Sequence, residues 1–365
     1  MTPLPSIPRP THSRASSLER IPTYAPATTS AIDRTVPEPV PAEVLEEQTY
    51  FETNHEPPYL PEVREKLREF IRFHTDRPDP RRIVLVTSGG TTVPLENNTV
   101  RFIDNFSAGT RGATSAEEFV ANGYAVVFLH RQFSLLPYSR HYSHTTNCFL
   151  DYLAIDDNGQ VVIDAAYQQE MKVVYQQYRK AMDENLILFV PFTTVNQYLF
   201  TLKLISHELE VGAGARALFY LAAAVSDFFL PRSKISEHKI QSGSGGNSLV
   251  LDLDPVPKFL KRLVENWAPR AMIVSFKLET DENLLIGKAR GALERYSHQL
   301  VIGNLLQTRK RTVLFVTKNE AKEYSITEEQ EKQGVEIESI IVPNVIKAHS
   351  KWIADIQQHQ QHQQQ

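Results

Sequence analysis

The stretch Ser88–Thr114, SGGTTVPLENNTVRFIDNFSAGTRGAT, directly follows the strand-like run RIVLVT. A pair of glycines, Gly89 and Gly90, opens it, and a second cluster of small residues near Gly109 precedes a predicted helix. A strand, a glycine-containing loop and a helix in this order are typical of phosphate binding in an α/β fold. A polar segment that contains a proline, here called the excursion, separates the two clusters between Gly90 and Ser107. This spacing excludes the P-loop and dinucleotide motifs, whose glycines lie within a few residues of one another.

The bulk properties predict a folded, soluble protein, and they leave open a local basic pocket for a phosphorylated metabolite. The 365 residues are 41% hydrophobic, which is enough to bury the core of one large domain or two ordinary ones. The net charge of −4 argues against nucleic acid as a partner. The single cysteine, Cys148, excludes a disulfide framework, and we expect no signal peptide and no membrane span. The cytoplasm is therefore the expected compartment, with the nucleus as an alternative.

Composition predicts three parts along the chain. Residues 1–45 are rich in Pro, Ser and Thr and are predicted to be disordered. Residues 46–356 are predicted to form a single α/β domain. Residues 357–365 carry the low-complexity sequence QQHQQHQQQ and are predicted to be a disordered tail.

Predicted strands and helices alternate between these ends, which is typical of a mostly parallel sheet covered by helices. The predicted strands are Ile83–Thr87, Tyr124–His130, Leu186–Phe192, Ala217–Val225, Met272–Phe276, Gln299–Asn304 and Val313–Thr317. The predicted helices are Ala113–Asn122, Gln168–Asn185, Val195–Glu210, Pro257–Trp267 and Glu282–Ser297. The expected fold class is a Rossmann-like three-layer α/β sandwich. Residues 238–257, HKIQSGSGGNSLVLDLDPVP, interrupt the alternation and predict a projecting hairpin or flap.

Several candidate ligand-binding residues follow predicted strands, and the carboxyl ends of parallel strands form the binding crevice of such sheets. Arg101, Asp104 and Asn105 lie in the excursion and offer a guanidinium, a carboxylate and an amide. The run LAAAVSD places Ala222–Ala224 and then Asp227 at a strand end. Small residues there allow either helix packing or close approach of a ligand, and Asp227 could accept hydrogen bonds or hold a metal through water.

Three further candidates come from the flap and from two later strands. Lys239 lies on the flap, from where a lysine could reach a phosphoryl transition state, whereas His238 is interpreted as structural. Phe276 and Asn304 end their strands. Phe276 could belong to the core or stack on a base, and Asn304 could read the base edge. His130, His141, His144 and Cys148 lack zinc-ligand spacing, and no serine nucleophile motif is present.

Five stretches together resemble the eukaryotic, stand-alone type of phosphopantothenoylcysteine synthetase, also called phosphopantothenate–cysteine ligase. They are TSGGTTVPLENNTVRFIDNFSAGTRGATSAEEF, YLAAAVSDFFLP, EHKIQSG, VPKFLKRLVENWAP and SFKLETD, within residues 80–347. The resemblance implies a reaction of coenzyme A biosynthesis in two steps. The 4'-phosphopantothenate carboxylate attacks the nucleotide α-phosphate and releases pyrophosphate. The amine of L-cysteine then attacks the acyl-nucleotidylate and releases the nucleoside monophosphate.

The resemblance also implies roles for individual residues. Nucleotide binding is implied for Gly89, Ser107, Gly109, Gly112, Phe276 and Asn304. Phosphopantothenate binding is implied for Arg101, Asn105, Ala223, Ala224 and Asp227. The implied catalytic residues are Lys239, for forming the acyl-nucleotidylate, and Asn105, for its onward reaction. Arg101 is expected to reach the neighbouring site of a homodimer. The expected co-substrate is ATP or CTP with Mg²⁺, and no metal-ligating residues are assigned.

Two alternative functions stay open at this point. A Rossmann-like oxidoreductase fits the alternation of strands and helices, but the missing G-x-G-x-x-G motif opposes it. A non-catalytic scaffold of a coenzyme A-synthesising assembly would use the Pro-rich segment to dock other pathway enzymes, such as the decarboxylase. The sequence does not decide between ATP and CTP.

Overall fold

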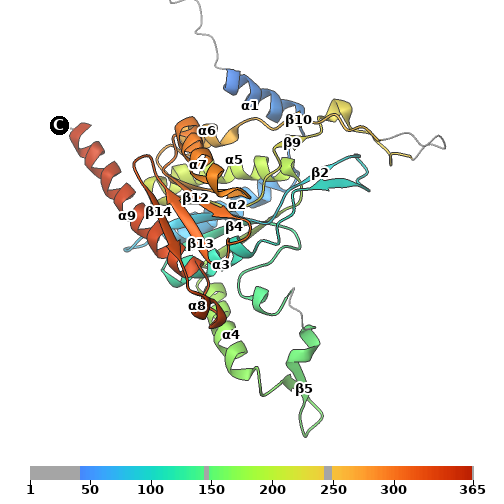
Figure 1. Ribbon diagram of the computed structural model, residues 1–365, viewed down its shortest axis with the longest axis vertical. Helices are drawn as coiled ribbons and strands as arrows, with labels where there is room; N and C mark the ends of the chain where they lie inside the picture. The colour runs from blue at the N-terminus through green and yellow to red at the C-terminus, as the bar shows by residue number, and fades with distance from the viewer. Residues whose placement is uncertain (1–41, 144–147, 242–248, 364–365) are drawn as a thin grey trace, which may run out of the picture. The chain divides into compact units, whose positions relative to one another are not determined.

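An eight-stranded sheet forms the centre of the computed structural model, which describes residues 42–143, 148–241 and 249–363. The sheet lies at the centre of Figure 1, where β4, β12, β13 and β14 are labelled. Its strand order is β14-β13-β12-β11-β8-β1-β4-β7. The strands are β1 (Ile83–Ser88), β4 (Ala125–Arg131), β7 (Ile187–Phe192), β8 (Ala217–Leu221), β11 (Met272–Glu279), β12 (Leu300–Leu305), β13 (Thr312–Val316) and β14 (Ala321–Ser325). The strands from β7 to β12 pair in parallel, whereas β13 and β14 add antiparallel pairings at one edge.

The order of the parallel strands creates a switch point between β1 and β8. The chain runs outward from β1 through β4 to β7, then returns to β8 on the other side of β1 and continues through β11 to β12. This is the doubly wound order of Rossmann folds, in which loops on either side of the switch point separate and leave a crevice. Burial explains the continuous apolar sequences, since β1 is buried along its whole length.

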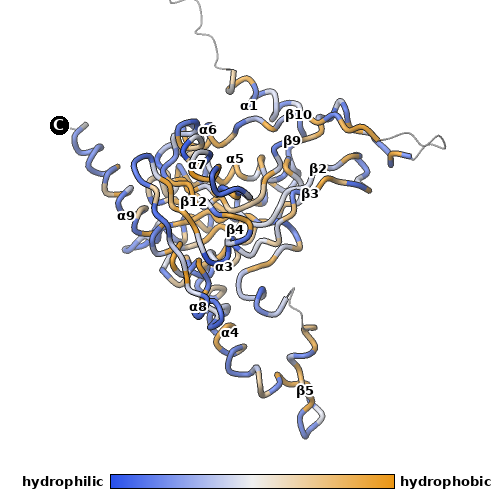
Figure 2. The backbone as a smooth tube through the Cα atoms, viewed as in Figure 1, coloured by the Kyte–Doolittle hydropathy of each residue, from blue (hydrophilic) through white to orange (hydrophobic). Residues whose placement is uncertain are grey.

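Helices cover both faces of the sheet, which confirms the predicted three-layer α/β sandwich. One face is covered by α2 (Leu60–Thr75), α5 (Val195–Gly212), α6 (Phe259–Arg262) with the π-helical turn η5 (Leu263–Trp267), and α7 (Glu282–Tyr296). The other face is covered by α3 (Thr110–Ala121), α4 (Gln168–Asp183) and α9 (Glu338–Gln363). Hydrophobic residues are concentrated along the central strands (Figure 2). No helix among the described residues is long and apolar enough to cross a bilayer.

Small elements lie outside the main sheet and carry the loops around the site. Three strand pairs are β2 (Thr92–Pro94) with β3 (Phe102–Asp104), β5 (Leu153–Ile155) with β6 (Val161–Ile163), and β9 (Phe228–Phe229) with β10 (Asp254–Pro255). The remaining elements are α1 (Ala42–Thr53), α8 (Glu328–Lys332), η1 (Ser139–His141), η2 (Phe149–Tyr152), η3 (Gly214–Arg216) and η4 (Arg232–Lys234). Of the predicted flap, residues 242–248 lie outside the described residues.

Both ends of the described chain differ from the prediction of disordered segments. Helix α1 begins at Ala42, inside the segment 1–45, because Glu47 and Tyr50 are buried against the domain. Helix α9 continues to Gln363, inside the segment 357–365, because its first half is packed in the core and glutamine sustains a helix well. Residues 1–41 lie outside the described residues, as do the last two.

Candidate active site

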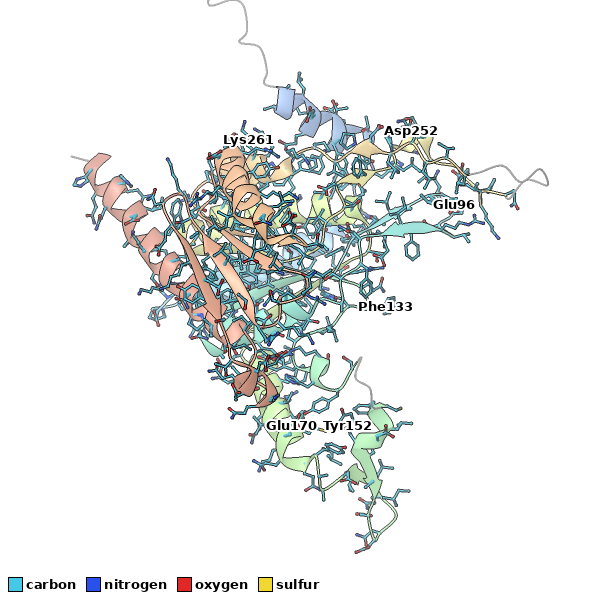
Figure 3. All side chains as sticks on the ribbon, viewed as in Figure 1. Glu96, Phe133, Tyr152, Glu170, Asp252 and Lys261 are labelled. Atoms are coloured by element: carbon cyan, nitrogen blue, oxygen red, sulfur yellow. The ribbon has the colours of Figure 1, made fainter. Side chains whose placement is uncertain are left out.

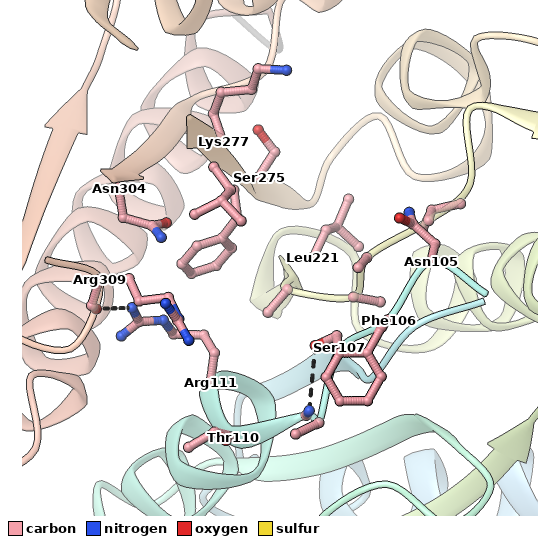
Figure 4. Close-up of a pocket in the computed structure, with 18 of the residues that line it drawn as sticks. Asn105, Phe106, Ser107, Thr110, Arg111, Leu221, Ser275, Lys277, Asn304 and Arg309 are labelled. Atoms are coloured by element: carbon pink, nitrogen blue, oxygen red, sulfur yellow. Dashed lines mark hydrogen bonds between the residues drawn. The ribbon is translucent and has the colours of Figure 1, made fainter. Parts of the chain in front are cut away.

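A cavity of about 1050 Å³ lies at the carboxyl ends of β8, β11 and β12, beside the switch point. Its lining combines the loop after β8, the ends of β11 and β12, and the start of α3 (Figure 4). One side of the cavity is formed by apolar residues of α5 and α6, and the other by the segment before α9. The cavity therefore extends across the edge of the sheet and has room for two ligands side by side.

The excursion of the opening stretch is a β-hairpin whose two ends meet again. After Gly90 the chain forms β2 and β3 and returns to Asn105, whose backbone N–H donates to Thr91 O at 3.0 Å. A Cβ atom on Gly90 would lie only 1.8 Å from the Asn105 carbonyl oxygen, so only glycine fits. The hairpin thus leaves the turn after β1 and returns to the same place, and Asn105 comes to line the cavity.

The start of α3 gives the cavity a surface that favours anions. Gly109 caps the helix with φ 86°, and Ser107 Oγ accepts from the Gly109 N–H at 3.4 Å. The first turn has no acidic residue, and the backbone N–H groups at a helix start have no intrahelical partners. Ser107, Gly109 and Thr110 line the cavity. The second small-residue cluster thus lies at a helix start whose free N–H groups favour an anion.

The loop after β8 forms the floor beside the switch point. Strand β8 ends at Leu221, earlier than the predicted Val225, because the next residues bond to the loop after β1. Ala224 N–H donates to Gly89 O at 2.8 Å and Ala223 N–H to Thr87 Oγ1 at 3.1 Å. Ala223, Ala224 and Asp227 all line the cavity, and the Asp227 carboxylate lies 4.0 Å from Lys258 Nζ.

Phe276 and Asn304 lie on the neighbouring strands β11 and β12, and both line the cavity. The Phe276 ring packs edge-on against Tyr220 with centroids 4.9 Å apart, so core packing fixes one side of it. Asn304 is buried yet reaches the cavity with its amide. An aromatic face beside an amide is suited to a heterocyclic base.

Four of the predicted residues do not line this cavity. Gly89 has φ 82° and Gly112 lies against Ser88, so their lack of a side chain serves close backbone packing. Arg101 lies on the hairpin loop, and Lys239 lies on the segment before residue 242. Arg101 donates to Glu96 and to the carbonyl of Ile240, the residue directly after Lys239. Asp104, a further residue of the excursion, pairs with Arg131 at 2.6 Å.

Basic residues that sequence reasoning missed also line the cavity. They are Arg111, Arg140, Lys258, Lys277, Arg309 and Lys310. Arg111 donates to Glu338 at 2.6 Å and to the Arg309 carbonyl at 2.5 Å, which ties α3 to the loop after β12. Each lies near the end of a strand or the start of a helix, and this position could have indicated them from the sequence. Among the described residues, no three His, Cys, Asp or Glu side chains form a group that could hold a metal ion.

An ion network supports the wall next to α3. Arg140 donates to Glu117 and to Glu336, at distances between 2.6 and 2.9 Å. Burial opposes ionisation of Glu117, but hydrogen bonds from His141 and Arg140 lower the pKa of its carboxyl group below the ordinary value. His141, considered above as a metal ligand, therefore belongs to this network.

Ser275 and His298 form a second pair that the sequence did not reveal. Ser275 lines the cavity, and its Oγ lies 2.7 Å from Nε2 of the buried His298. Burial lowers the pKa of His298 to about 4, so the ring is neutral at neutral pH. The pair fixes the Ser275 hydroxyl in the cavity wall.

Comparisons with known proteins agree with this architecture. The family model described as the DNA/pantothenate metabolism flavoprotein C-terminal domain matches residues 80–145 and 205–341. The chain is 50% identical over 378 residues to the phosphopantothenate–cysteine ligase CAB2 of Saccharomyces cerevisiae, covering 97% of this chain and 98% of the relative.

The chain belongs to the phosphopantothenate–cysteine ligase family. The human phosphopantothenate–cysteine ligase is 45% identical over 280 residues, covering 75% of this chain and 88% of the human protein. The resemblance drawn from the quoted stretches is thereby confirmed.

Solved structures extend the match to three dimensions. A Cab2 mutant in complex with phosphopantothenate-cysteine superimposes with a TM-score of 0.78 at 52% identity, covering 85% of this ligase-family chain and 99% of the mutant. A Streptococcus pneumoniae flavoprotein of DNA/pantothenate metabolism, 18% identical, has a TM-score of 0.50 and covers 74% of this chain and 99% of its own, a likeness in fold alone.

Proposed function

We propose that this protein joins 4'-phosphopantothenate to L-cysteine through an acyl-nucleotidylate, as a ligase of coenzyme A biosynthesis. The observation that carries the proposal is the cavity at the switch point, which combines a helix N-terminus, an aromatic–amide corner and a small-residue floor in a chain of this family. An adenylating or cytidylating enzyme needs these features together, because a nucleotide and an acyl substrate must meet at the α-phosphorus.

The nucleotide occupies the end of the cavity next to α3 in this proposal. Phosphate oxygens accept from the free N–H groups of the first helical turn and from Ser107. The base lies against Phe276 and meets the Asn304 amide. Gly89 and Gly112 contribute indirectly, since their close packing holds the loop and the helix in place. Arg111 adds positive charge beside the phosphates.

The phosphopantothenate occupies the other end, along the floor after β8. Ala223 and Ala224 leave room for the ligand to approach the backbone, and Asp227 accepts hydrogen bonds from its hydroxyl or amide groups. Asn105 lies between the two ends and holds the acyl group during both steps. Lys258, which lies near Asp227, supplies a cation for the terminal phosphate.

The chemistry then proceeds in two displacements. A carboxylate oxygen of phosphopantothenate attacks the α-phosphorus, and the bond to the β-phosphate oxygen breaks with release of pyrophosphate. The cysteine amine next attacks the acyl carbon, loses a proton, and displaces the nucleoside monophosphate. Lys239 stabilises negative charge in the first displacement, and Asn105 orients the carbonyl in the second. ATP or CTP brings Mg²⁺, which neutralises the polyphosphate when bound. Among the described residues no three His, Cys, Asp or Glu side chains form a group for this ion, so its ligands would be phosphate and water oxygens.

The active form in this proposal is a cytoplasmic homodimer in which Arg101 reaches the neighbouring site. Arg101 does not line the cavity of its own chain among the described residues. The hairpin that carries it exposes Val100 and Phe102 to solvent in the single chain. Exposed apolar side chains next to a functional cation support contact with a second copy. Other enzymes of coenzyme A biosynthesis, such as the decarboxylase, are proposed as further partners.

The direct test is product analysis with the purified full-length protein. It is incubated with 4'-phosphopantothenate, Mg²⁺ and ATP or CTP, with and without cysteine, and pyrophosphate and products are followed by mass spectrometry. We expect a cysteine-dependent amide product and a preference between the nucleotides. Asn105→Ala should release pyrophosphate without amide product, whereas Lys239→Ala should release neither. A folded dimer that is silent with both nucleotides would overturn the proposal in favour of the scaffold, and hydride transfer to a nicotinamide cofactor in favour of the oxidoreductase.

A further inference from the structure

Glu96 is a fully buried carboxylate in the loop between β2 and β3, at the outer end of the hairpin (Figure 3). Its Oε2 accepts from the backbone N–H groups of Val100 and Arg101, at 3.3 and 2.9 Å. Its Oε1 accepts from Arg101 Nη1 at 3.1 Å and from the backbone N–H of Ile240 at 3.3 Å. The backbone N–H of Arg101 contributes most to lowering the pKa of Glu96, so the carboxylate is ionised at neutral pH.

These bonds join the hairpin loop to the segment that carries Lys239. The Glu96 backbone pairs with Ser236 in a parallel bridge, and Asn97 N–H donates to Ser236 O at 2.9 Å. Arg101 Nη1 donates to the Ile240 carbonyl at 2.9 Å while Glu96 accepts from the N–H of the same residue. Both polar groups of the Ile240 backbone are thereby held, directly after Lys239 in the chain.

These contacts of Glu96 with Arg101 and Ile240, here called the clamp, bring together two cations that lie far apart in the sequence. Arg101 and Lys239 are separated by more than a hundred residues in the sequence. Arg101 binds Glu96 directly, and Glu96 also binds the backbone N–H of Ile240, the residue after Lys239. Neither is among the described residues that line the cavity of their own chain. Because Glu96 and Arg101 hold the backbone directly after Lys239, a movement of one segment should carry both cations with it.

We propose that Glu96 is a positioning residue that joins Arg101 and Lys239 into one unit, so that both cations act in the same site, that of the partner subunit. This inference rests on the proposed function, which gives Arg101 a role across the homodimer. It adds that Lys239 acts across the interface as well. Each site of the dimer would then be built from the cavity of one chain and the cationic unit of the other.

Mixed dimers distinguish this arrangement from its alternatives. Two differently tagged chains are co-expressed, and the heterodimer is isolated by two affinity steps. In a dimer of Arg101→Ala and Lys239→Ala chains, both sites receive a defective unit, so we expect no more activity than in either variant homodimer. A gain to about half of the wild-type activity, as one intact site of two would give, would mean that the two cations serve different sites and would overturn the inference.

A second heterodimer tests the proposed function separately. When Arg101→Ala is paired with Asn304→Ala, the chain with the intact cavity receives the intact unit of its partner, so we expect about half of the wild-type activity. Absence of this gain would mean that Arg101 acts in its own chain, and would contradict the homodimeric site itself. The first heterodimer therefore tests whether Arg101 and Lys239 act in the same site, and the second tests whether Arg101 acts across the dimer.

The positioning role of Glu96 is tested by Glu96→Gln in the full-length enzyme. The amide places an N–H₂ donor against N–H donors, so we expect faster amide exchange at Ile240 and a loss of pyrophosphate formation on the order of 100-fold, with the KM for the nucleotide little changed. Glu237→Gln is the matched control, because exposed Glu237 joins the same two segments through Asn97 at 2.6 Å; it should stay within about twofold of wild type. Unchanged turnover of Glu96→Gln despite faster exchange at Ile240 would overturn the positioning role.

Discussion

The backbone of Asn105 packs directly on Gly90, at the point where the two ends of the β2–β3 hairpin meet. A Cβ atom at residue 90 would lie 1.8 Å from the Asn105 carbonyl oxygen and 2.9 Å from its carbonyl carbon. Both contacts are with backbone atoms, which cannot rotate away. The position of the Asn105 side chain in the cavity therefore depends on the absence of a side chain fifteen residues earlier.

Gly90→Ala should lower both stability and turnover. Overpacking at this contact should reduce the free energy of unfolding by about 3 kcal/mol, since the hairpin must shift, and Asn105 would shift with it. Urea unfolding and steady-state kinetics measure the two effects. Gly287→Ala is the control, because no atom lies within 4 Å of the added methyl group and the site is an exposed helical position. It should stabilise the protein by about 0.5 kcal/mol, and an equal loss in both variants would contradict the explanation.

Glu47 should be required to hold α1 on the domain. Its carboxylate lies 2.9 Å from Lys203 Nζ, accepts from Trp267 Nε1 at 3.0 Å, and also accepts from Arg262 Nε. Glu47→Ala leaves these donors without their acceptor, so the free energy of unfolding should fall by about 2 kcal/mol. Thermal melting of Glu46→Ala, at an exposed position of the same helix, serves as the control and should match the wild type.

The same contacts determine where the N-terminal segment can be removed. Deletion of residues 1–41 leaves α1 intact and should retain ligase turnover. Deletion of residues 1–53 removes Glu47 and buried Tyr50 and should lower the melting temperature by several degrees. Loss of turnover after the shorter deletion, in a dimer that melts normally, would show that a residue before Ala42 takes part in catalysis.

Acidification should destabilise the protein partly through His298. Burial lowers the pKa of this ring to about 4, below the ordinary value near 6.5 that the unfolded chain retains. The unfolded state therefore binds the proton more tightly, and stability is lost as the pH falls from about 6.5 towards 4, by about 3 kcal/mol in total. His298→Gln should flatten this slope in urea unfolding series, whereas His238→Gln, at an exposed position, should preserve it.

Asn304 should influence the choice between ATP and CTP. Its buried amide reaches the cavity next to Phe276, and an amide can pair with either the donor or the acceptor edge of a base. Asn304→Asp removes the donor, so the ratio of kcat/KM values for the two nucleotides should change by about tenfold or more. Phe276→Leu removes the aromatic face without changing hydrogen bonding, and should raise the KM for both nucleotides alike. An unchanged ratio in Asn304→Asp would assign base selection to other residues.

The parallel strands were predictable because burial on both faces makes them continuous apolar runs between turn residues. The predicted strand at Ile83–Thr87 matches β1 within one residue. Helix α2 was missed although Leu67, Phe70 and Ile71 have helical spacing, because its charged, proline-flanked sequence follows the segment predicted to be disordered. Its stability comes from packing on α5, which a local pattern does not contain.

Part of the cavity lining was predictable from the topology of the sheet. Ala224 and Asp227 follow β8, and Phe276 and Asn304 lie in the last halves of β11 and β12. A parallel sheet brings these strand ends to one edge. Contacts between distant segments were not predictable. The pairing of Ser275 with His298 and the clamp at Glu96 depend on register and on loop conformation, which composition and spacing do not determine.

Because the hairpin is closed at its base, sequence changes inside it are separated from changes in the strand, the turn and the helix that precede and follow it. Since Gly90 and Asn105 join the ends of β2 and β3, the chain between them can lengthen, shorten or change sequence while the strand, the glycine turn and α3 keep their arrangement. The hairpin can in this way diverge in sequence and length without a change at the helix start that lines the cavity.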